Sequence, residues 1–270
     1  MSEEEDAGLH ELKSKIRDER GFNAHVYKDK CLRRRFAVRM RARGLESFAD
    51  YSALLDADPL EYDRLVDTLT INVTKFFRNP ETWEVIAHDV IPYLMEGDAP
   101  VDVWSAGCAS GEEPYSLSIL LHEWAEAIGR EADLKRVRII GTDIDRGSLA
   151  AAEQAAYPEI SFDDTPSELR AKWFSDSSPS YLRTEAKAAV GFRKADLISG
   201  DALKDQSLII CRNVIIYLDR SVQEQIFRTF YDSLLPGGIL ILGRVETLLG
   251  PTRGLFKAVS TRERIYQKPV

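Results

Sequence analysis

Two adjacent carboxylates, Glu112 and Glu113, follow a loop of small residues that includes Gly107 and Gly111. Small residues let a ligand lie against backbone atoms. The loop lacks the Gly-Lys-Ser/Thr of a phosphate-binding loop and the three glycines of a dinucleotide fingerprint, and two acids at this place would repel a pyrophosphate. A cofactor with a positive centre and no phosphates fits better, and S-adenosylmethionine is the common candidate. Taken alone, the stretch also fits a strand-to-helix turn with solvated glutamates.

A second acidic position strengthens the ligand-binding interpretation. The apolar run Val137–Gly141 leads into Thr-Asp-Ile-Asp and then into a helix-like segment from Ser148 to Gln154. In open α/β sheets, ligands bind beyond the carboxyl ends of the strands. Asp143 is therefore placed to accept hydrogen bonds from two ribose hydroxyls, whereas Asp145 is expected to cap the next helix.

The later part of the chain continues the alternation of strands and helices. Residues 191–197 are predicted to form a strand that ends at Asp196, where adenine commonly meets a polar side chain and a backbone amide. A further buried strand at 207–211 is followed by the turn Arg212-Asn213-Val214. Apolar spacing predicts the amphipathic helices and the last strands at 113–128, 222–235, 239–243, 255–259 and 263–267. This alternation is typical of a doubly wound, mostly parallel sheet, here with a terminal antiparallel pair.

Composition limits the class of protein. The chain has 270 residues, a formal net charge of −8 and three scattered cysteines. No run is apolar for long enough to cross a bilayer, and the acidic start is unlike a signal peptide. The cysteines are expected to be free thiols in a reducing, cytoplasmic compartment. The four histidines show no metal-ligand spacing, so we expect no metal site.

One short segment carries the opposite charge. Residues 28–43 contain eight Lys or Arg side chains against Asp29 alone, a net charge of +7. Leu32, Phe36 and Met40 recur every four residues among them, which predicts a helix with one packed face and one basic face. A solvated helix face is the simpler reading. No aromatic platform for nucleic acid accompanies the patch, so an acidic protein surface is the better partner.

Four motifs together closely resemble the chemotaxis receptor glutamate methyltransferase (CheR-type) family. The resemblance runs from about residue 10 to the C-terminus, and several of the motifs are peculiar to this family rather than shared by methyltransferases at large. The motifs are Leu69-Thr-Ile-Asn-Val-Thr-Lys-Phe-Phe-Arg78, Trp104-Ser-Ala-Gly-Cys-Ala-Ser-Gly-Glu-Glu-Pro-Tyr-Ser116, Thr142-Asp-Ile-Asp145 and Cys211-Arg-Asn-Val-Ile-Ile-Tyr-Leu-Asp219.

The resemblance implies a class I S-adenosylmethionine-dependent α/β methyltransferase with a small all-helical N-terminal domain. We expect the helical domain at 1–68, a linker contributing to the active site at 69–82, and the methyltransferase domain at 83–270. An antiparallel β-subdomain is expected as an insertion at about 166–195. In many relatives this subdomain also grips a peptide at the receptor C-terminus. Its short Ser/Pro turn here leads us to expect no such tether.

The resemblance also implies roles for individual residues. Arg78 would orient the acceptor carboxylate, with Tyr217 in support. Glu113 would contact the methionine part of the cofactor, with Glu112 as the alternative. The remaining cofactor contacts would come from Asn72, Thr74, Arg78, Gly107, Asp143, Asp196, Leu197, Asn213 and Val214.

The implied reaction is methyl transfer to receptor glutamates, which forms glutamyl methyl esters and S-adenosylhomocysteine. A glutamate has a pKa near ~4.3 and needs no general base at pH 7, which agrees with the absence of a His–Asp or Ser–His pair in the motifs. The basic helix would dock on cytoplasmic receptor helices through Arg33, Arg34, Arg35, Arg39, Arg41 and Arg43. Neither nucleic acid nor membrane insertion is expected. A methyltransferase for another acceptor and a non-catalytic cofactor-binding scaffold stay open as alternatives. A dehydrogenase is the weakest option.

Overall fold

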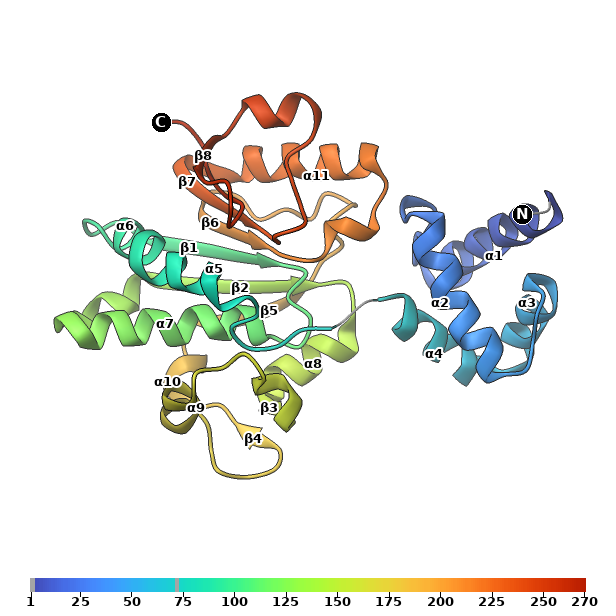
Figure 1. Cartoon of the computed structure of the whole chain (residues 1–270), viewed down its shortest axis with the longest axis horizontal. Helices are drawn as coiled ribbons and strands as arrows, with labels where there is room; N and C mark the ends of the chain where they lie inside the picture. The colour runs from blue at the N-terminus through green and yellow to red at the C-terminus, as the bar shows by residue number, and fades with distance from the viewer. Residues whose placement is uncertain (1–2, 71–72) are drawn as a thin grey trace. The chain divides into compact units, whose positions relative to one another are not determined.

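The computed structural model describes residues 3–70 and 73–270, which form two compact units. The first unit contains the described residues up to 70 together with Tyr217–Gln223, and the second contains residues 73–216 together with Glu224–Val270. Figure 1 shows the helices of the first unit and the sheet of the second.

The first unit is helical, as the sequence predicts. Its basic helix buries Leu32, Phe36 and Met40 on one face, which confirms the predicted spacing. Asp58 begins the last helix by accepting the backbone N–H groups of Leu60 and Glu61, the usual way to satisfy donors at a helix start. The helices are α1 (Glu3–Arg20), η1 (Ala24–Val26), α2 (Asp29–Ala42), α3 (Phe48–Ala57) and α4 (Pro59–Leu69).

A short segment from late in the chain belongs to this helical unit. Tyr27 and Leu218 form an isolated antiparallel bridge. The backbone N–H of Lys28 donates to the Tyr217 carbonyl at 2.9 Å. Residues 217–223 include the end of η5 (Ile215–Tyr217) and the first turn of α11 (Arg220–Ser233).

The second unit is built on a seven-stranded sheet in the order β5-β2-β1-β6-β7-β9-β8. The first five strands in this order run parallel, and β9 is antiparallel to both β7 and β8. The predicted fold class and the terminal antiparallel pair are therefore confirmed. The strands are β1 (Val101–Ala106), β2 (Val137–Asp143), β5 (Val190–Lys194), β6 (Gln206–Cys211), β7 (Leu234–Leu242), β8 (Lys257–Ser260) and β9 (Ile265–Gln267).

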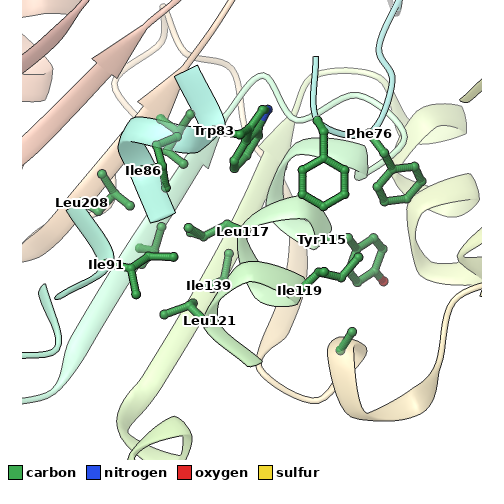
Figure 2. Packing of buried hydrophobic residues seen from close by; sticks show 14 of the residues in the cluster. Phe76, Trp83, Ile86, Ile91, Tyr115, Leu117, Ile119, Leu121, Ile139 and Leu208 are labelled. Atoms are coloured by element: carbon green, nitrogen blue, oxygen red, sulfur yellow. The ribbon is translucent and has the colours of Figure 1, made fainter. Parts of the chain in front are cut away.

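Helices pack against both faces of the sheet. Alternate residues of β1 point to opposite sides, so neighbouring residues of this strand contact helices on different faces. Val103 joins the hydrophobic cluster that includes Leu117 and Leu121 of α7 (Glu112–Ile128). Figure 2 shows these two leucines directed toward Ile139 and the strands. Trp104 instead meets Phe230 of α11, edge to face at 5.5 Å. The remaining helices are α5 (Pro80–Val85), η2 (Ile86–Val90), α6 (Ile91–Leu94), η3 (Glu131–Arg136), α8 (Arg146–Gln154) and η6 (Gly250–Gly254).

The inserted subdomain differs in detail from the segment expected at about 166–195. Its two strands, β3 (Ala156–Tyr157) and β4 (Ser180–Tyr181), pair over two residues each, which is too short for an alternating pattern to mark. From Val190 onward the chain already forms β5 of the central sheet. The other elements of this subdomain, drawn below α7 in Figure 1, are η4 (Glu159–Phe162), α9 (Ser167–Trp173) and α10 (Thr184–Lys187).

Candidate active site at the carboxyl edge of the sheet

The loop after β1 is held against the end of β2. The backbone N–H groups of Gly107 and Cys108 both donate to the Thr142 carbonyl, at 2.8 and 3.0 Å. Gly107 has a φ of +76°, and a Cβ there would lie 2.5 Å from Cγ2 of Val214. No other residue fits without displacing Val214, so the loop stays close to the turn after β6.

Asp143 is the last residue of β2, and its carboxylate accepts backbone hydrogen bonds from the loop after β1 and from the turn after β2. Its Oδ2 accepts the Ala109 N–H at 2.9 Å and its Oδ1 accepts the Asp145 N–H at 3.0 Å. Burial raises the pKa of Asp143, and these backbone hydrogen bonds oppose the rise. A carboxylate offers about four acceptor positions, so each oxygen can still accept a ligand hydroxyl. Asp145 caps α8 through the Gly147 N–H, as predicted.

The two glutamates at the start of α7 point to different neighbours. Glu112 is 2 % exposed and accepts from the Ser110 hydroxyl at 2.7 Å, with Ser161 of η4 at 3.5 Å. Glu113 accepts from the Ser105 hydroxyl at 2.8 Å, and its Oε2 lies 3.9 Å from Nη1 of Arg212. Burial raises the pKa of Glu113 to about 7 against the opposing charge of Arg212. Glu113 is thus a carboxyl group whose charge a cationic ligand would restore.

The turn after β6 rests on a carboxylate that the sequence reasoning missed. Glu246 is 3 % exposed and accepts the backbone N–H groups of Asn213, Val214 and Ile215, each at 3.0 Å. These bonds hold Asn213 at a φ of +62°. The available signal was an acid three residues after the predicted strand 239–243.

Asn213 offers an unused acceptor at this turn. Its Oδ1 is buried and finds no hydrogen-bond donor within the part of the chain that the structure describes. Buried polar atoms without partners are rare in native structures. A ligand with a hydroxyl or amino group at this place would satisfy it.

Arg78 lies in a linker between the last helix of the first unit and α5. It is half-buried, and its Nη1 donates to the Val73 carbonyl at 2.9 Å. Thr74 is also half-buried. Asn72, the remaining linker residue of the predicted site, lies outside the described residues.

The other predicted cofactor contacts follow β5. Asp196 is half-buried, and its Oδ1 accepts the Ile198 N–H at 2.9 Å in a local turn. Leu197 beside it is half-buried as well. Tyr217, the predicted support for Arg78, belongs to the helical unit, whereas Arg78 belongs to the other unit, so its role stays a prediction.

Several of the arginines predicted to dock are already paired within the helical unit. Arg39 donates to the fully buried Glu61 through Nε and Nη2, at 2.9 and 2.5 Å. Arg43 pairs with Asp58 at 3.0 Å, and Arg33 pairs with Asp6. The Nε atom of Arg35 is buried. Arg34 and Arg41 stay exposed, and Arg41 donates to the Ala37 carbonyl of its own helix.

Neither a membrane-spanning helix nor a metal-binding cluster occurs within the described ranges, 3–70 and 73–270. In these ranges no helix is long and apolar enough to cross a membrane. The same residues contain no group of three or more His, Cys, Asp or Glu side chains that could hold a metal ion.

Comparison with known proteins decides the family. The model of the CheR methyltransferase SAM-binding domain matches residues 72–265, and that of the CheR all-alpha domain matches residues 7–70. The chain belongs to the CheR methyltransferase family. It is 32 % identical over 238 residues to a chemotaxis protein methyltransferase of Listeria innocua, covering 87 % of this chain and 88 % of the relative.

Two further relatives agree with this assignment. The chemotaxis protein methyltransferase of Klebsiella aerogenes is 30 % identical over 260 residues, covering 93 % of this chain and 87 % of the relative. Chemotaxis protein methyltransferase 2 of Pseudomonas aeruginosa is 32 % identical, with 80 % and 77 % covered. This CheR-family protein is therefore an S-adenosylmethionine-dependent methyltransferase of chemotaxis.

Proposed function

We propose that this CheR-family methyltransferase forms methyl esters on glutamate side chains of chemoreceptor cytoplasmic helices, and so acts in the cytoplasm. The observation that carries the proposal is that the second unit has carboxylates suited to bind the cofactor and also an arginine in the linker. Asp143 and Glu113 suit the hydroxyls and the ammonium group of the cofactor, and Arg78 suits an acceptor carboxylate. Arginine binds carboxylates with two parallel hydrogen bonds.

The described residues fit S-adenosylmethionine as the cofactor. Asp143 would hold the ribose hydroxyls with its remaining acceptor positions. Asp196 and Leu197 would contact the adenine, and Asn213 with its buried, unsatisfied Oδ1 would contact the opposite side. Val214, Gly107 and Thr74 would complete the site. When bound, the cofactor supplies a methyl group on a positively charged sulfur.

The protein's own part in the reaction is positioning and exclusion of water. The acceptor carboxylate is already ionised at pH 7, so no side chain has to remove a proton. Arg78 would orient that carboxylate, and Tyr217 would support it. Charge is lost as the ester forms, so a dry site favours the transition state over the ground state.

The experiment is transfer of a labelled methyl group to receptor cytoplasmic fragments, with glutamate-to-alanine controls at the candidate acceptor positions. Base-labile label that disappears in the controls would support glutamyl ester formation. Label on another kind of residue would contradict the proposed acceptor. Cofactor binding without any transfer would favour the scaffold alternative.

The role of Arg78 has its own test in the same assay. We expect Arg78→Ala to abolish transfer while S-adenosylhomocysteine binding, measured by calorimetry, is partly retained. Arg78→Lys keeps the charge but loses the paired donors, so it should recover little activity. Full transfer by Arg78→Ala would rule out this role.

A further inference from the structure

Arg212 follows directly after β6 and is a buried cation. The proposed function assigns it no role. The residue is 7 % exposed. Replacing a buried ion pair with packed apolar side chains is often neutral or stabilising. Stability is therefore a weak reason for an arginine at this place, and its contacts suggest another one.

The first contact is with the linker that carries Arg78. Nη2 of Arg212 donates to the Arg78 carbonyl at 2.6 Å and lies 3.1 Å from Oδ1 of Asn79. Phe77 and Asn79, on either side of Arg78, have φ values of +52° and +60°. Such backbone strain persists only where the surroundings hold it, and Arg212 supplies two of the bonds that do so.

The second contact is with the start of α7. Nη1 of Arg212 lies 3.9 Å from Oε2 of Glu113, within ion-pair range but beyond hydrogen-bond distance. Trp83 closes the arrangement: its ring centre lies 5.5 Å from the guanidinium carbon, and its Nε1 donates to the Arg78 carbonyl at 3.1 Å. One guanidinium thus joins the linker, α5 and α7.

We propose that Arg212 is a positioning residue, which holds the Arg78 segment and the carboxylate of Glu113 in one arrangement through a single guanidinium. The inference rests on the proposed function, because it takes Glu113 as the contact for the cofactor's ammonium group and Arg78 as the contact for the acceptor. The lysine variant would keep the charge near Glu113 but could not make both linker bonds from a planar fork.

The charged groups around Glu113 define a pH readout. Arg212 lowers the pKa of Glu113, Glu246 raises it, and Arg78 lowers it. The thiols of Cys108 and Cys211 are also close, but burial raises their pKa well above the ordinary value, so they stay neutral near pH 7. Removing Arg212 leaves Glu246 as the nearby charge that raises the pKa and Arg78 as the one that lowers it. The midpoint of any Glu113-dependent binding must then move to higher pH.

The experiment measures S-adenosylhomocysteine affinity by calorimetry between pH 6 and 9, for the full chain and its Arg212→Met and Arg212→Lys variants. We expect the wild-type affinity to rise with pH around the Glu113 pKa, and the midpoint of Arg212→Met to lie about one pH unit higher, with about fivefold weaker binding at pH 7. In a Glu113→Gln background, Arg212→Met should shift no midpoint, because the titrating group is absent.

Arg212→Lys separates positioning from charge. We expect its midpoint and S-adenosylhomocysteine affinity to stay close to wild type, while kcat of methyl transfer falls about tenfold or more through the displaced Arg78 segment. An unchanged midpoint in folded Arg212→Met, or a wild-type kcat in Arg212→Lys, would overturn the inference.

The test of Arg212 does not depend on any one variant or on methyl transfer alone. If Arg212→Met does not fold, Arg212→Lys alone still decides through its kcat. The titrations contain no acceptor, so failure of wild-type transfer to receptor fragments would count against the proposed function and leave the binding test of Arg212 intact.

Discussion

At the scale of single residues, Glu113 is kept in surroundings that oppose its charge. Its pKa rises from an ordinary 4.5 to about 7 because burial outweighs the attraction of Arg212. Proton binding to Glu113 therefore stabilises the fold fully below pH 4.5, and this contribution is lost as the pH rises through about 7. Near neutral pH the unliganded protein is therefore destabilised by the buried charge of Glu113. A positively charged ligand would stabilise that charge.

This predicts the behaviour of Glu113→Gln, which keeps an acceptor for Ser105 but carries no charge. Relative to wild type, the unliganded variant should gain stability as the pH rises from 5 to 8, by about 3 kcal/mol for a pKa difference of this size. Urea unfolding at several pH values measures the gain. The exposed Glu96→Gln controls for the loss of one charge and should change little. Parallel stability curves for Glu113→Gln and wild type would contradict the prediction.

At the scale of elements, α2 carries arginines of two kinds: some are paired with carboxylates inside the helical unit, and others are exposed to solvent. Arg39 reaches a fully buried glutamate, and Tyr51 of α3 donates to the same carboxylate at 2.9 Å. Burial raises the pKa of Glu61, but the hydrogen bonds from Arg39 and Tyr51 outweigh it and lower the pKa. This network therefore ties three helices together around one buried charge.

Removing one partner of such a network leaves a buried charge uncompensated. We expect Arg39→Met to destabilise the protein by about 3 kcal/mol or more. Arg34→Ala, on the exposed face of the same helix, should stay within about 0.5 kcal/mol of wild type. Denaturant unfolding followed by circular dichroism compares the two variants. Equal losses in both would show that Arg39 has no special structural role.

The same elements show what sequence reasoning can reach. The spacing of Leu117 and Leu121 predicted α7, and that of Leu32 and Phe36 predicted α2, because a helix repeats every 3.6 residues whatever surrounds it. The parallel sheet followed from the alternation of these helices with apolar runs.

What the sequence could not predict depends on contacts between distant residues. Glu61 and Arg39 are 22 residues apart, and Glu246 lies 33 residues from Asn213. Nothing local marks either carboxylate as buried. Because the two-residue strands β3 and β4 are also set by tertiary contacts, the bounds of the inserted subdomain could not be read from periodicity.

At the scale of the whole molecule, the chain is acidic, with a net charge of −8, but carries +7 on residues 28–43. The structure narrows the part of that segment that is available to a partner. Arg33, Arg39 and Arg43 have carboxylate partners inside the helical unit. Arg34 and Arg41 are exposed, so of the predicted docking residues they are the most available to the acidic partner that we propose.

Reversing both charges should therefore weaken docking without unfolding the protein. For Arg34→Glu with Arg41→Glu, we expect KM for receptor fragments to rise about tenfold at low salt, because complementary charges speed encounter and suppress mismatched contacts. The rise should shrink above ~0.5 M salt, where screening is nearly complete over a few ångströms. S-adenosylhomocysteine affinity should not change. A double variant with the same change in net charge, Arg253→Glu with Lys257→Glu, alters exposed residues of the other unit. If that control raises KM equally, the overall charge governs encounter and the basic helix has no local role; if only the helix variant does so, docking is local to α2.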